Sequence, residues 1–154
     1  GIILTKEMAK SVIAWEPASE RIIMVRIETR YTKVTLIQVY APTNAAEDQE
    51  KDEFYELLQD ILDATPEHDM KVIMGDFNAQ VGRDNTGWEE TLGKEAIGVR
   101  NENGERLLSY CSSNKLKIGG SMFRHKNIHL GTWRSPNGST VNHIEHICHQ
   151  RRWA

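Results

Sequence analysis

The stretch Val72-Ile-Met-Gly-Asp-Phe-Asn78 is the sharpest local signal in this chain. The apolar run at 70–74 has the length of a buried strand and stops at a glycine. After it come a carboxylate, Asp76, and a carboxamide, Asn78, which can converge because residues i and i+2 of an extended chain point to one side. Oxygen ligands suit Mg²⁺, and an Asp can orient an attacking water. The plainer alternative is an Asx-turn that only caps a loop.

A second strand-end motif, Tyr40-Ala-Pro-Thr43, lies upstream. The β-rich run at 21–28 and the alternating run at 34–40 predict two strands joined by a hairpin turn at 30–33. Pro42 ends the second strand, because it has no N–H for the ladder. A Tyr that leaves a strand at such a turn can direct its hydroxyl at a phosphate, although an amphipathic edge position is the commoner role.

Two segments have the apolar periodicity of helices. The clearer one runs from Asp48 to about Ala64, and acidic residues crowd its first turns, where the helix dipole favours them. The shorter one runs from Gly104 to about Asn114, with Asn103 as its expected N-cap. Their expected buried residues are Phe54, Leu57, Leu58, Ile61 and Leu62 in the first helix and Leu107, Leu108 and Cys111 in the second.

The last third of the chain contains three further candidate strands. These are residues 116–118, 131–133 and 141–147, separated by turn segments at 124–127 and 135–138. Hairpin, helix, strand, helix and more strands predict one layered α/β domain over residues 1–154. Trp133 is expected in its core. Trp88, in the long polar loop at 80–103, is expected to anchor that loop rather than to stack on a base.

Charge is unevenly distributed along a chain of net charge −3. Residues 44–69 contain ten acidic residues and one Lys, whereas residues 115–154 contain seven Lys/Arg, five His and one acid, Glu145. A basic segment of this kind can face a polyanion, but a solvated acidic helix and a mixed basic tail give the same counts. Two cysteines, Cys111 and Cys148, are too few for a disulfide scaffold, and no apolar run approaches the roughly 20 residues of a membrane span. We therefore expect an intracellular protein, nuclear or cytoplasmic, that does not engage a membrane.

The segment His143-Ile-Glu-His-Ile-Cys-His149 raises the alternative of a zinc site. It contains three imidazoles, a thiol and a carboxylate. On a strand, however, His143 and Glu145 face one way while His146 and Cys148 face the other, which splits the ligand set. Surface histidines on a basic strand are the favoured interpretation.

A set of motifs in a fixed order carries a resemblance to a known family. The motifs are Tyr40-Ala-Pro-Thr43, Glu53-Phe-Tyr-Glu-Leu-Leu58, Met74-Gly-Asp-Phe-Asn-Ala-Gln-Val-Gly82, Asn101-Glu-Asn-Gly104, Thr132-Trp-Arg-Ser-Pro-Asn-Gly138 and Asn142-His-Ile-Glu-His-Ile147. In this order they resemble the endonuclease domain of RTE/BovB-type non-LTR retrotransposons. That domain is part of the endonuclease/exonuclease/phosphatase superfamily, and the resemblance covers residues 1–153.

The resemblance implies a DNase I-like four-layer α/β sandwich and a phosphodiesterase that nicks DNA with Mg²⁺ or Mn²⁺. By the same resemblance, Asp76 orients or deprotonates the attacking water, and Asn78 contacts the scissile phosphate or the metal. These two residues are thus the expected metal ligands. Tyr40 contacts the phosphate, and Glu145 stands where the family has an Asp that orients a catalytic His.

The family pattern also includes strands that this sequence does not contain. Two early strands, one ending in an Asn and one in a metal-binding Glu, would precede Gly1, and a Ser-Asp-His strand would follow Trp153. We therefore expect a domain that is incomplete at both ends, with weak or no nicking activity, weak non-specific DNA binding and self-association through exposed sheet edges. The alternatives are a non-catalytic descendant that binds nucleic acid or protein, and a related phosphatase acting on small phosphoesters or lipids.

Overall fold

The computed structural model describes residues 1–124, 131–139 and 141–153. Its helices are α1 (Lys6–Ala9), α2 (Asp48–Ala64) and α3 (Glu102–Ser113), with single 3-10 turns η1 (Gly119–Ser121) and η3 (Arg151–Trp153). Its strands are β1 (Val12–Pro17), β2 (Ile22–Glu28), β3 (Lys33–Tyr40), β4 (Met70–Asp76), β5 (Leu116–Ile118), β6 (Trp133–Arg134), β7 (Val141–Asn142) and β8 (Glu145–Gln150).

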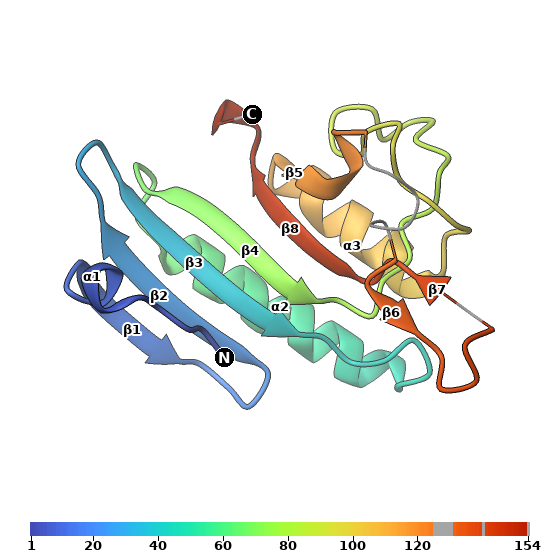
Figure 1. Cartoon of the computed structure of the whole chain (residues 1–154), viewed down its shortest axis with the longest axis horizontal. Helices are drawn as coiled ribbons and strands as arrows, with labels where there is room; N and C mark the ends of the chain where they lie inside the picture. Colours follow the sequence, from blue (N-terminus) through green and yellow to red (C-terminus); the bar gives the residue numbers. More distant parts are fainter. Residues whose placement is uncertain (125–130, 140, 154) are drawn as a thin grey trace.

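Six of the strands form one mixed sheet in the order β1-β2-β3-β4-β8-β5. β3 and β4 pair in parallel, with α2 as the crossover between them, and the other neighbouring pairs are antiparallel. β8, near the end of the chain, is inserted between β4 and β5 (Figure 1). β6 and β7 form a separate two-stranded ribbon.

The core lies between one face of the sheet and the helices α2 and α3, which lie behind that face in Figure 1. Ile37 of β3, Ile73 of β4 and Leu58 of α2 meet there and are at most 1% exposed. Residues on the opposite face, such as Leu36 and Met74, are only half-buried. The expected α/β class is therefore confirmed, and the described residues form one helix layer and one sheet layer, two of the four layers that we expected.

The helices follow the predicted apolar stripes, with one correction at a helix start. α2 has the predicted bounds, and its fully buried apolar positions are Phe54, Leu58 and Leu62. α3 begins two residues earlier than predicted, and its N-cap is Asn101 rather than Asn103. The Asn101 side chain accepts a hydrogen bond from Gly104 N at 2.8 Å, the contact that an N-cap makes with the third helical residue. No helix among the described residues has the length and apolar character needed to cross a bilayer.

The C-terminal strands differ from the prediction in two respects. The strand expected at 141–147 is divided into β7 and β8, because Val141–Asn142 pair with β6 whereas Glu145–Gln150 pair with β4 and β5. Trp133 is 42% exposed and not in the core, since it belongs to the β6–β7 ribbon outside the main sheet. Positions 125–127 of the expected turn lie outside the described residues. Trp88 does anchor its loop, packed against the core with the Arg100 guanidinium 6.0 Å from its ring centroid.

Candidate functional site

Three polar side chains form a row across the sheet where β3 and β4 end. In the strand register, Asp76 is paired with Tyr40 on one side and with Glu145 on the other. Adjacent strands lie about 4.8 Å apart and paired residues point to the same face, so these side chains are neighbours. Together with Gln38 and Thr132, they line an open hollow of about 670 Å³ on the face that the helices do not cover.

The Asp76 carboxylate is held by the turn that follows it. Its Oδ1 accepts a hydrogen bond from Asn78 N at 2.8 Å, so the Asx-turn foreseen as the plainer alternative is present. The Asp76 carbonyl accepts a further hydrogen bond from Ala41 N at 2.8 Å, which joins this turn to the one after β3. The Asx-turn and a place in the hollow are therefore compatible, because the turn fixes the carboxylate whose side chain lines the hollow.

Asn78 does not join the row. Its φ of 49° lies in the left-handed region, so the alternation of an extended chain ends at Asp76 and the i, i+2 argument does not apply. The Asn78 side chain donates from Nδ2 to the Ala41 carbonyl at 2.9 Å, and Asn78 is not among the residues that line the hollow. Its contact joins the two turns that carry Tyr40 and Asp76.

Gly75 is required by the close approach of β4 to β3. A Cβ at this position would lie 2.0 Å from the Val39 carbonyl oxygen, and the φ of 141° is one that L-residues rarely adopt. A glycine directly before Asp76 therefore keeps the two strand ends, and with them Asp76 and Tyr40, in contact.

Two asparagines at the start of α3 hold both turns in place through hydrogen bonds. Asn103 Nδ2 donates to the carbonyls of Pro42, at 3.0 Å, and of Asn78, at 3.2 Å. Asn101 Oδ1 accepts from Gln80 N at 3.0 Å. The sequence analysis found the Asn101-Glu-Asn-Gly104 motif but not this role, because a local pattern predicts a helix cap and not the distant carbonyls that it reaches.

The histidine-rich segment divides between the two faces of the sheet. His146 is 3% exposed, so it is not the surface histidine that we expected, and its Nε2 lies 2.7 Å from the Ala79 carbonyl oxygen. Burial lowers the pKa of His146 to about 4, which keeps its ring neutral at pH 7. Cys148 is buried on that same side, while Glu145 faces the hollow. Within the described ranges, no group of three or more His, Cys, Asp or Glu side chains could hold a metal ion.

The basic residues at the end of the chain lie far from the hollow. β8 is antiparallel to β4, so the chain after Gln150 is at the opposite end of the sheet from Asp76. There Arg151 donates to Thr91 Oγ1 and Arg152 donates to the Asp69 carbonyl, each at 3.0 Å. Residues 125–130 of the basic segment lie outside the part of the chain that the structure describes.

Solved structures with a similar arrangement identify the architecture. The endonuclease domain of TRAS1, a telomere-specific non-LTR retrotransposon, has a TM-score of 0.59 and 16% identity, over 89% of this chain and 52% of that domain. The 3′ phosphatase NExo from Neisseria, bound to a product DNA hairpin, also has a TM-score of 0.59, with 18% identity over 90% of this chain and 58% of that one. The chain has the endonuclease/exonuclease/phosphatase fold. In this fold, Tyr40, Asp76 and Glu145 stand at one end of the sheet.

The chain is also similar in sequence to a curated protein. The chain is 37% identical over 152 residues to craniofacial development protein 2 from Bos taurus, which covers 99% of the chain and 25% of that protein. The chain therefore spans about a quarter of the length of this curated relative. No family model matches the chain. The resemblance inferred from the ordered motifs is thus confirmed.

Proposed function

We propose that the hollow at Tyr40, Asp76 and Glu145 is a phosphodiester site that acts slowly on DNA with Mg²⁺ or Mn²⁺. The observation that supports this most is the row itself, which brings two carboxylates and a phenol from three adjacent strands to one open hollow. DNA is the favoured substrate class because NExo, which has the same fold, is a DNA-bound phosphatase and the TRAS1 domain is an endonuclease.

Asp76 and Glu145 are the residues that would hold the metal ion. Mg²⁺ binds through one or two carboxylates and keeps several of its waters, and the open hollow has room for them. Asn78 fits this role less well, because its Nδ2 is directed at the Ala41 carbonyl. When bound, the ion neutralises charge on the phosphate oxygens and makes a bound water more acidic.

The protein side chains would position the reactants. The Tyr40 hydroxyl, on a side chain that is 53% exposed, would donate a hydrogen bond to a phosphate oxygen. One Asp76 oxygen is held by Asn78 N, and the other would accept a hydrogen bond from the attacking water. His146 borders the hollow, but the residue is 3% exposed and its Nε2 lies 2.7 Å from the Ala79 carbonyl oxygen, so we do not assign its ring the protonation of a leaving group there. Loss of one stabilising group from such a site costs roughly 10²–10³ in rate, which is why we propose slow turnover.

Nicking of supercoiled plasmid tests the proposal, because a single break per molecule is detected. We expect slow relaxation that requires Mg²⁺ and that disappears in Asp76→Ala and Glu145→Gln. Asp60→Asn, which removes an exposed carboxylate from α2, is the matched control and should retain the activity. Nicking that persists in Asp76→Ala, or DNA binding without any Mg²⁺-dependent nicking, would contradict a catalytic role for this hollow.

A further inference from the structure

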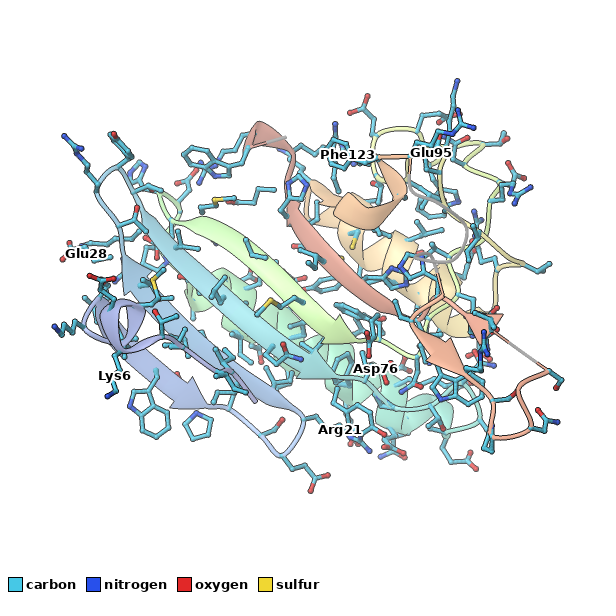
Figure 2. The ribbon with its side chains drawn as sticks, viewed as in Figure 1. Lys6, Arg21, Glu28, Asp76, Glu95 and Phe123 are labelled. Atoms are coloured by element: carbon cyan, nitrogen blue, oxygen red, sulfur yellow. The ribbon has the colours of Figure 1, made fainter. Side chains whose placement is uncertain are left out.

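Arg21 is paired with Tyr40 in the sheet and so lies beside the row of Tyr40, Asp76 and Glu145, although it does not itself line the hollow. Tyr40 N donates to the Arg21 carbonyl at 2.9 Å, which continues the β2–β3 pairing by one residue before the start of β2. The Arg21 guanidinium carbon lies 5.7 Å from the Tyr40 ring centroid, and Nη1 donates to the Tyr40 carbonyl at 3.5 Å. Arg21 and Asp76 are therefore at the same end of the sheet (Figure 2).

The Arg21 guanidinium is paired with a carboxylate that an anionic ligand can replace. Its Nη2 donates to Glu50 Oε1 of α2 at 2.6 Å, and the two side chains are 29% and 46% exposed. Ion pairs with this much solvent access contribute little to stability. A phosphate group offers the same guanidinium acceptor oxygens in place of Glu50 Oε1, so the exchange of Glu50 for phosphate has a low cost.

DNA needs a cationic contact at this end of the sheet, because two of the three side chains in the row are carboxylates. Asp76 and Glu145 repel a polynucleotide when no metal is bound, and Arg151 and Arg152 lie at the far end of the sheet. Arg21 is a cation of the described residues that contacts Tyr40 of the row directly.

We propose that Arg21 binds a DNA phosphate beside the Tyr40 ring, and that Glu50 competes with DNA for the guanidinium. This inference rests on the proposed function of the hollow. The sequence motifs did not include Arg21, so this cation is an addition to the site. Glu50, in the first turn of α2, would weaken DNA binding.

Fluorescence anisotropy of a short labelled DNA oligonucleotide, titrated over a series of salt concentrations, tests both parts. Arg21→Gln should weaken DNA binding about tenfold. It should also reduce the slope of log affinity against log salt concentration by about one, because one counterion fewer is released. Glu50→Gln should tighten binding roughly two- to fivefold more than Glu53→Gln, which removes one exposed charge from the same helix without touching Arg21. In the Arg21→Gln background, this difference between the Glu50 and Glu53 variants should vanish.

The outcomes separate this inference from the proposed function. If wild-type protein binds DNA and Arg21→Gln binds with the same affinity and salt slope, the assignment of Arg21 is overturned while the hollow retains its proposed function. Wild-type protein that does not bind DNA at about 50 mM salt overturns both. Should Arg21→Gln fail to fold by circular dichroism, equal affinities of Glu50→Gln and Glu53→Gln would still overturn the inference.

Discussion

Replacing Gly75 with alanine should destabilise the sheet at the point where the candidate site is built. The new Cβ would lie 2.0 Å from the Val39 carbonyl oxygen, and the φ of 141° would be strained for alanine. The backbone strain costs about 1–3 kcal/mol and the collision about 1–3 kcal/mol more, or about 2–6 kcal/mol in total. For a domain of this size, that loss lowers Tm by roughly 5–20 °C.

Two other glycines separate the collision from the backbone strain. Gly87 has a φ of 79° with nothing within 4 Å of its Cβ position, so Gly87→Ala should cost only about 1–2 kcal/mol. Gly104 has no positive φ, but its Cβ would lie 1.9 Å from the Gln80 carbonyl oxygen, so Gly104→Ala tests the collision without backbone strain, offset by the roughly 1 kcal/mol that alanine gains over glycine in a helix. Thermal denaturation followed by circular dichroism should rank Gly75→Ala as the most destabilised. A Tm for Gly75→Ala within about 2 °C of that for Gly87→Ala would refute the close-approach argument.

Three further predictions concern stability. Hydrogen bonds from Arg26, at 2.6 and 2.9 Å, lower the pKa of Asp69. Its pairing should therefore stabilise the protein above the unfolded-state pKa of about 3.9, and this stability should be lost as pH falls through the lower folded-state pKa. Asp69→Asn should reduce the fall in the free energy of unfolding at acid pH, measured by urea denaturation at a series of pH values. An unchanged pH profile would count against the role of the Arg26–Asp69 pair. Asn101→Ala removes the α3 N-cap and should cost about 0.5–2 kcal/mol in urea denaturation, and no loss would contradict the capping role. Leu58→Ala, in the core, should lower the free energy of unfolding by about 2–5 kcal/mol. Ile147→Ala should lower it much less, because the Ile147 side chain is 54% exposed on the open face of the sheet. Equal losses for the two variants would show that the open face is part of the core.

The parallel pair of strands and its helix could be predicted from the sequence. The alternating run before Tyr40, the apolar stripe of α2 and the short run before Asp76 are local patterns, and a strand–helix–strand order places the two strand ends at one edge. The neighbourhood of Tyr40 and Asp76 follows from these patterns alone.

Other parts of the fold depend on contacts that no local pattern contains. β1 is an edge strand whose residues are mostly exposed, so it lacks a buried face to detect and depends on pairing with β2. Glu145 reaches Asp76 through a pairing of distant segments, and its place was expected only from the resemblance to a family. Arg21 was missed because its contact with Tyr40 depends on the β2–β3 register, which composition and spacing do not specify. Trp133 was wrongly expected in the core, because its apolar character does not show that its strand belongs to a ribbon outside the main sheet.

The position of β8 between β4 and β5 has a consequence for synthesis on the ribosome. β4 can pair with β3 as soon as both have emerged, but among the described strands β5 is joined to the sheet through β8, which is translated later. The partly made chain therefore exposes an unpaired edge of β4 while residues 77–144 are being added, and such edges pair readily with other chains. Completion of the sheet and assembly of the Asp76–Glu145 pair are the same event, so a nascent chain acquires its candidate site only when β8 inserts.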